Sequence, residues 1–219
     1  MIVSELVRAV ARDVEAVDRV LDEKDRVREQ AIKMSRDIIR MSSDIVTLVH
    51  SGDIDSAANL VNELRKVVAE FSKLIEPHAE LRHSGFANNA LAEYVEALMF
   101  FNFVVKGAVP SLDELGVHYV PYLLGLCDFV GELRRYIMDL VRQGDFDKAF
   151  EILSFMEGVY EVVRKLDYPD ALVPGLRHKV DVMRRLIDDT KMFLLDLKSR
   201  KELNEAVREA LQALTRSRV

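Results

Sequence analysis

Apolar residues recur every three or four positions along most of the chain, which is the spacing of amphipathic helices. Over residues 22–49 the series is unbroken and falls at Val27, Ala31, Met34, Ile38, Met41, Ile45 and Leu48. A similar series precedes it, at Val3, Leu6, Val10, Val14, Val17 and Leu21. No glycine or proline interrupts residues 3–49. We therefore expect one very long first helix whose apolar seam packs against other helices.

Turn-forming residues divide the remainder of the chain into further helices. Asp53 follows Gly52 and is expected to cap a second helix over 54–75, which Pro77 closes. The other helices are expected over 84–106, 121–142, 146–166 and 175–198, the last with an extension to 215. Strand-like alternation is absent from the sequence. The pattern therefore predicts an all-α, single-domain antiparallel bundle of six or seven helices over residues 1–219.

Composition supports this fold and narrows the function. Nine glycines and five prolines in 219 residues are too few for the many turns of a sheet protein. The net charge of −6 disfavours nonspecific binding of nucleic acid by the whole surface. The single cysteine, Cys127, excludes an intrachain disulfide and a cysteine-built metal site. Apolar runs reach about nine residues against the roughly 20 that span a bilayer, so we expect a soluble cytoplasmic protein without a membrane partner.

Carboxylates within the two most apolar segments are the strongest candidates for chemistry. The segments are residues 90–105, with Glu93 and Glu96, and residues 122–141, with Asp128 and Glu132. The spacing places the two acids of each pair on one helical face. Burying an unpaired carboxylate costs several kcal/mol or forces its protonation. Two such pairs on consecutive helices therefore indicate that something cationic lies between them.

Two interpretations of these acids remain open at the level of sequence. Either Arg134 or Arg135 neutralises them, or a metal cation binds to them. Ligands that are all oxygen favour Mg²⁺ or Mn²⁺ over zinc. A ferritin-like di-iron site is disfavoured because no histidine lies three positions after the glutamates. The histidines have no metal-site spacing, and we expect His83 and His118 to have loop or capping roles.

Basic residues form a stripe beside the apolar seam of the first helix. Lys33, Arg36 and Arg40 recur at steps of three and four, so they share one face of the helix. They either follow the phosphates of a nucleic acid or form a solvated face interleaved with Glu29 and Asp37. The spacing alone does not decide between these interpretations.

Four segments of the chain resemble the translin/Trax superfamily in an archaeal, Trax-like form. They are EKDRVREQAIKMSRDIIRMSSDIVTLVHSGD (23–53), LAEYVEALMFFNFV (91–104), the stretch from YLLGLCDFVGELRR to FMEGVY (122–160) and LRHKVDVMRRLIDDTKMFLLDLKSR (176–200). The motifs EYVEA and DFVGEL, in this order, carry most of the resemblance. It covers residues 22–200.

This resemblance implies an all-α subunit that assembles into a hollow octamer and binds RNA and single-stranded DNA inside it. It also implies an Mg²⁺-dependent endoribonuclease, because Trax-like members have an acid set that translin-like members lack. The family acids correspond here to Glu93 and Glu96 in EYVEA and to Asp128 and Glu132 in DFVGE. We therefore expect these four residues to bind Mg²⁺ or Mn²⁺ and to be catalytic.

The charge of such an octamer restricts where RNA binds. Eight chains at −6 would carry about −48 (8 × −6) and would repel RNA unless the basic side chains were gathered on one surface. We expect Lys33, Arg36 and Arg40 to line that surface and to contact the RNA backbone. The alternative function is a noncatalytic, translin-like scaffold for RNA or single-stranded DNA, with the acids paired to Arg134 or Arg135. A third candidate is a regulatory bundle that binds metal but no nucleic acid.

Overall fold

The computed structural model describes the backbone of residues 2–216, and the described part contains eight α-helices and no strand. The helices are α1 (Ile2–Ser51), α2 (Ile54–Ile75), α3 (Ala79–Arg82), α4 (Gly85–Lys106), α5 (Leu112–Leu115), α6 (Tyr119–Gln143), α7 (Phe146–Val163) and α8 (Leu176–Arg216). Six of them are long, and α3 and α5 have four residues each. The prediction of an all-α protein is confirmed. Residues 1 and 217–219 lie outside the described backbone.

Contacts divide the chain into two compact units, residues 1–101 and 102–219. The division falls within α4, so one continuous helix belongs to both units. The prediction of a single domain over residues 1–219 stays a prediction.

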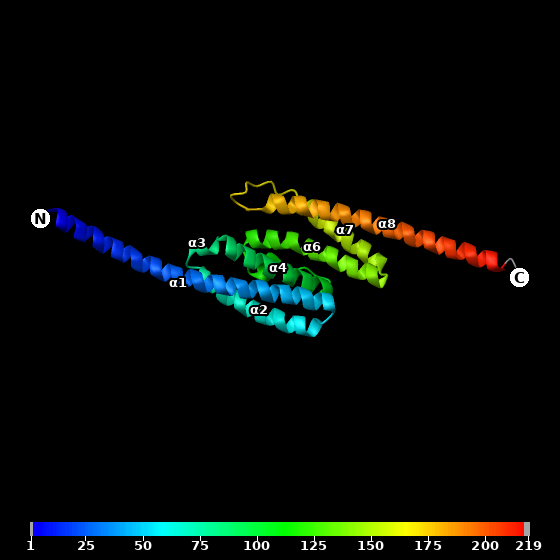
Figure 1. The fold of residues 1–219 in the computed structure, drawn as a ribbon, viewed down its shortest axis with the longest axis horizontal. Helices are drawn as coiled ribbons and strands as arrows, with labels where there is room; N and C mark the ends of the chain where they lie inside the picture. Colours follow the sequence, from blue (N-terminus) through cyan, green and yellow to red (C-terminus); the bar gives the residue numbers. More distant parts are fainter. Residues whose placement is uncertain (1, 217–219) are drawn as a thin grey trace. The chain divides into compact units, whose positions relative to one another are not determined.

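In the first unit, α1 and α2 form an antiparallel pair, side by side along their packed length (Figure 1). Gly52 makes the sharp turn between them with a φ of 82°, a value that favours glycine. The Asp53 carboxylate then accepts a hydrogen bond from the Ser56 backbone N–H at 3.2 Å. Because this bond satisfies an otherwise free N–H of the first turn, α2 begins directly after the turn. The predicted cap and the predicted helix over 54–75 are both confirmed.

The two helices pack through matching apolar seams. The buried residues of the α1 seam are Ala31, Ser35, Ile38, Ser42, Ile45 and Val49, and those of α2 are Ala57, Val61, Leu64, Val68, Phe71 and Ile75. Both series advance by steps of four and three, the heptad spacing of helices that pack at a small angle. The seam thus continues through the whole length of α2.

The centre of the α1 seam differs from the sequence prediction by one position. Met34, Met41 and Leu48 are only half-buried, whereas Ser35 and Ser42 are almost fully buried. The small serines leave room for the large residues on the α2 seam, and the Ser35 hydroxyl donates to the Ile32 carbonyl at 2.8 Å. Apolar periodicity missed these positions because serine is a polar residue, yet it can occupy a seam. Ser35 satisfies its hydroxyl within its own helix, whereas the buried Ser42 hydroxyl has no hydrogen-bond partner among the described residues.

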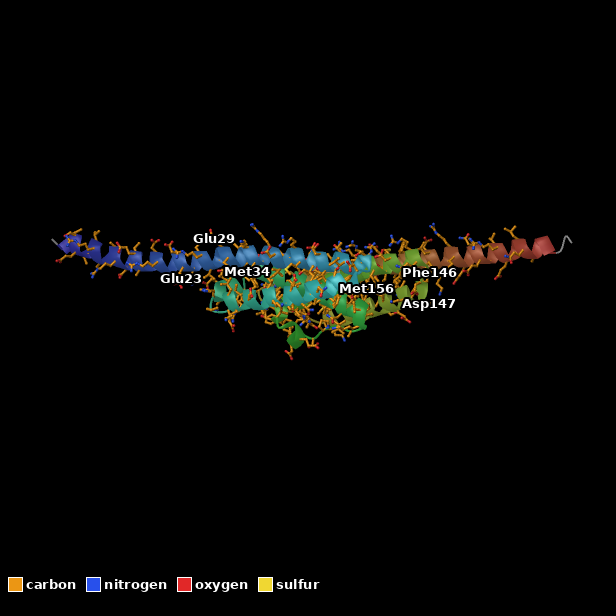
Figure 2. The ribbon with its side chains drawn as sticks, turned by 90° about the horizontal axis from the view of Figure 1, so that it is seen from below. Glu23, Glu29, Met34, Phe146, Asp147 and Met156 are labelled. Carbon is orange, nitrogen blue, oxygen red and sulfur yellow. The ribbon has the colours of Figure 1, made fainter. Side chains whose placement is uncertain are left out.

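The first part of α1 extends beyond this packed region. We call residues 3–21 the N-terminal rod; in the first unit it has no neighbouring helix along it (Figure 1). Its large apolar residues are exposed by 54 to 73%: Val3, Leu6, Val7, Val10, Val14, Val17, Val20 and Leu21. In Figure 2 the packed section of α1, at Met34, is crowded with side chains of other helices, and the rod is not. The prediction of one long helix is confirmed, but the rod part of its seam is uncovered.

In the second unit, α6, α7 and α8 pack against one another. The α6 helix begins at Tyr119, two residues before the predicted start at Pro121, because His118 is its N-cap. The Nδ1 atom of His118 accepts from the Val120 backbone N–H at 3.3 Å, which confirms the predicted capping role. Gly144, with a φ of 85°, ends α6, and the Asp145 side chain caps α7.

Candidate metal and nucleic-acid site

Glu93 and Glu96 lie on α4 in a segment that is otherwise buried. Both side chains are half-buried, and the neighbouring residues Val95, Ala97 and Leu98 are completely buried. A spacing of three places both carboxylates on the same side of the helix. The structure therefore confirms the premise of the sequence argument, that acids occupy a helix whose surroundings are apolar.

Tyr94 lies between these glutamates along the chain and points into the core, where it is 3% exposed. Burial raises the pKa of its hydroxyl, and the positive charge of Arg65 on α2 partly offsets this rise. Tyr94 therefore remains neutral at physiological pH and packs as a core residue. Arg65 places one positive charge of the first unit near Tyr94, in the turn of α4 that carries Glu93 and Glu96.

Asp128 on α6 holds a cation that belongs to the chain itself. The Nζ atom of Lys179 on α8 donates to both carboxylate oxygens of Asp128. The two side chains are 32% and 31% exposed, so the pair is partly screened by solvent. The contact shows that the Asp128 carboxylate is positioned to accept a cation from the direction of α8.

Glu132 lies one turn further along α6, on the same face as Asp128. Its Oε2 atom is 3.7 Å from Nη1 of Arg135, and the two side chains are 21% and 57% exposed. A long contact to an exposed arginine contributes little, since exposed ion pairs give about 0.2–1 kcal/mol. The sequence interpretation that Arg134 or Arg135 neutralises the acids thus describes a weak contact at Glu132.

Sequence reasoning missed Lys179, the partner of Asp128. The two residues are 51 positions apart and no local motif connects them. Only the packing of α8 against α6 brings them together. A lysine in the first turn of a helix, where a positive charge is disfavoured by the helix dipole, was the single available signal.

The four predicted ligands are described as two pairs, one in each unit. In the part of the chain that the structure describes, no group of three or more histidine, cysteine, aspartate or glutamate side chains lies close enough together to hold a metal ion. The donor chemistry of each pair nonetheless suits a hard divalent cation, because the groups are half-buried carboxylates. Metal binding by the four acids stays a prediction.

The basic stripe on α1 is fully accessible. Lys33, Arg36 and Arg40 are all exposed and lie beside the seam that packs on α2. Arg40 forms an ion pair with Asp37 at 3.0 Å and keeps 70% of its side chain exposed. An exposed pair of this kind is weak and can exchange for a phosphate. The stripe is therefore available for an anionic ligand.

Cys127 precedes Asp128 and behaves as a core residue. Burial raises the pKa of its thiol to about 12, and the nearby Asp128 carboxylate adds to the rise. Because the thiol remains protonated well above pH 8, we expect iodoacetamide to alkylate it at least 100-fold more slowly in the folded protein than in urea. Mass spectrometry of timed samples measures both rates. Equal rates would contradict the burial of this thiol.

No helix in the described part of the chain is both long enough and apolar enough to cross a membrane.

The family profile that matches the chain is that of the Translin family, over residues 26–201. An uncharacterized protein of Methanocaldococcus jannaschii is 30% identical over 158 residues, which are 70% of this chain and 69% of that protein. A translin-associated protein X homolog of Schizosaccharomyces pombe is 24% identical over 56% of this chain and 57% of its own length.

Solved structures give the same result. The structure described as an AfC3PO–duplex RNA complex has a TM-score of 0.77 and 30% identity, covering 85% of this chain and 97% of that one. A structure of apo-NeC3PO has a TM-score of 0.74 at 22% identity, covering 83% and 96% respectively, and shows the shared fold. The resemblance seen in the sequence is thus confirmed.

Proposed function

The chain belongs to the Translin family, and from that premise we propose that it is an Mg²⁺- or Mn²⁺-dependent endoribonuclease. We place RNA and single-stranded DNA inside a hollow homo-octamer of this chain in the cytoplasm. The observation that carries the proposal is the position of the four acids. The half-buried carboxylates lie among buried apolar residues of α4 and α6, and the sequence resemblance places the acids of Trax-like members at these positions.

In this proposal Glu93, Glu96, Asp128 and Glu132 hold the metal ion. When bound, the ion supplies an activated water and stabilises charge on the scissile phosphate. Of these four carboxylates, we assign three to direct coordination and the fourth, held beside the ion, to the role of general base. In the structure the Lys179 ammonium group donates to both Asp128 oxygens, and in this proposal the metal ion takes its place on that carboxylate.

Lys33, Arg36 and Arg40 hold the RNA backbone. Their positive charges are exposed on one face of α1, and their spacing along the helix allows contact with successive phosphates. Nothing in the sequence resembles a base-reading motif, so binding depends little on RNA sequence. The AfC3PO structure that is 30% identical to this chain is a complex with duplex RNA, which supports RNA as the ligand class.

The experiment that tests the proposal is cleavage of an end-labelled, unstructured RNA by the purified full chain. We expect internal cuts in Mg²⁺, no cuts in EDTA, and recovery when Mn²⁺ replaces EDTA, because carboxylates bind both ions. Light scattering of the same sample checks that the assembly is intact. Absence of cleavage by an intact assembly in both metals would reject the enzymatic function.

The second candidate is a noncatalytic scaffold for RNA or single-stranded DNA. It is favoured by one observation: the chain's own cations, Lys179 and Arg135, already accompany Asp128 and Glu132. Crystals soaked in Mn²⁺ separate the two candidates. Anomalous density at the four carboxylates supports the enzyme, and retained ion pairs without density support the scaffold. Loss of RNA binding even at low salt would instead favour the metal-binding regulatory bundle.

A further inference from the structure

The N-terminal rod lies outside the part of the chain that the family profile matches. The profile begins at residue 26, and the rod is residues 3–21. The rod is helical throughout and exposes eight large apolar side chains. Scattered apolar residues are normal on a surface, but a contiguous row of this length on one helix marks an interaction surface.

The rod continues the seam by which α1 binds α2. Stepping back from Ala31 by the same alternation of three and four reaches Arg28, Lys24, Leu21, Val17, Val14, Val10, Val7 and Val3. The two basic positions mark the end of the intramolecular interface, and Lys24 forms an ion pair with Glu80 of α3 at 2.6 Å. Beyond Lys24 the same apolar register resumes without a covering helix in the first unit.

We propose that the rod pairs with the rod of a second copy of this chain as an antiparallel coiled coil. The apolar positions are symmetric about Arg12, so a two-fold axis at that residue aligns two rods in register. The core layers would be Val3 with Leu21, Val7 with Val17, and Val10 with Val14, each formed twice. A shift by one heptad in either direction exposes part of this seam again.

Charge selects the antiparallel orientation. A parallel pair would place Asp13 opposite Asp18 of the other copy at two symmetry-related sites, and like charges at these flanking positions repel. An antiparallel pair has one such contact, between the two Asp13 residues. It also places Leu6 beside Val20 of the other copy, which covers two side chains that are 61% and 54% exposed. The orientation therefore buries more apolar surface with less repulsion.

The size and charge of the rod suit a copy of itself better than RNA or an anionic membrane. Nineteen helical residues span about 28 Å, and a two-helix seam of that length buries on the order of 1,000 Å², the lower range for a specific interface. Over residues 3–21 four acidic and three basic side chains leave a charge of −1. RNA and anionic membranes favour basic surfaces, so neither suits the rod.

Disulfide trapping in the full-length protein tests both the partner and the orientation. In the variant Val7→Cys/Val17→Cys, the antiparallel register brings position 7 of one copy against position 17 of the other. We expect disulfide-linked dimers to be the main product of mild oxidation. Val7→Cys alone should yield at least tenfold fewer dimers, because the two copies of position 7 would lie about 15 Å apart along the axis. Native Cys127 is buried and does not compete.

A matched pair of variants controls for random collision. Adding Val10→Asp/Val14→Asp to the two cysteines places charges in the central layers and should reduce dimers at least tenfold. Adding Ala9→Asp/Ala16→Asp introduces the same charge on the face of the rod that points away from the seam. This variant should yield nearly as many dimers as the two cysteines alone. Equal trapping with and without the central aspartates would overturn the proposal, as would the absence of dimers. Equal trapping by Val7→Cys alone would overturn the antiparallel register.

This test is independent of the proposed enzymatic function. None of the substituted positions belongs to the acid pairs or to the basic stripe. All rod variants should cleave RNA at the same rate as the unchanged protein. Failure of cleavage therefore concerns the metal site, and failure of trapping concerns the rod.

Discussion

Replacing Asp128 by asparagine is expected to reduce metal-dependent RNA cleavage at least 100-fold while leaving the assembly intact. The asparagine keeps the size of the side chain but removes the negative charge that a divalent ion requires. A 100-fold loss corresponds to about 2.7 kcal/mol of transition-state stabilisation. Initial rates of RNA cleavage in Mg²⁺, with light scattering of the same samples, measure the two effects separately.

Two further variants make this result specific. Asp139→Asn changes the same chemical group on the same helix, where the carboxylate pairs locally with Arg142 at 3.3 Å, and should cleave normally. Lys179→Gln removes the cation that now occupies Asp128. If Asp128 serves only as the ion-pair partner of Lys179, Asp128→Asn and Lys179→Gln should reduce the cleavage rate equally. If Asp128 is a metal ligand, Lys179→Gln should retain Mn²⁺ binding in calorimetry. Undiminished cleavage by assembled Asp128→Asn would reject the assignment.

Replacing Lys33, Arg36 and Arg40 together by alanine is expected to weaken binding of every RNA alike. Each lost phosphate contact lowers the salt dependence of single-strand binding by about 0.7 in the slope of log K against log salt, so three contacts lower it by about 2. The side chains are exposed, so folding and assembly should not change. Fluorescence anisotropy with two unrelated RNAs, at several salt concentrations, gives the slopes.

The matched control lies on the same helix. Arg8, Arg12 and Arg19 in the N-terminal rod are also exposed, and their replacement by alanine removes the same total charge. We expect this control to lower RNA affinity only slightly, through the overall electrostatic field of the protein. The slope of log K against log salt should remain nearly unchanged. If both triple variants behave alike, the stripe is an ordinary solvated surface and RNA binds elsewhere.

Local signals along the chain predicted most of the helices. Asp53 and Gly144 mark ends that depend only on nearby backbone groups, so turn chemistry located them within a residue or two. The buried surroundings of Glu93 and Glu96 followed from the apolar residues around them on α4. These features could be predicted because each is determined within one helix.

Features that depend on a partner helix could not be predicted in this way. The seam of α1 includes Ser35 and Ser42 because of the side chains that α2 presents, and no apolar count finds them. Lys179 reaches Asp128 only after α8 packs on α6. The arginines near the acids were visible in the sequence, but sequence distance favoured them over the lysine that the fold supplies.

The Lys179–Asp128 contact also bears on how the protein matures. A tethered ammonium group is present at a high effective concentration as soon as α8 docks, whatever the supply of free metal. The charge of the Asp128 carboxylate is therefore compensated as soon as the protein folds, without a metal ion. If the proposed divalent ion binds at Asp128, its binding is an exchange in which it displaces the Lys179 ammonium group, which remains attached to the chain and returns when the metal leaves.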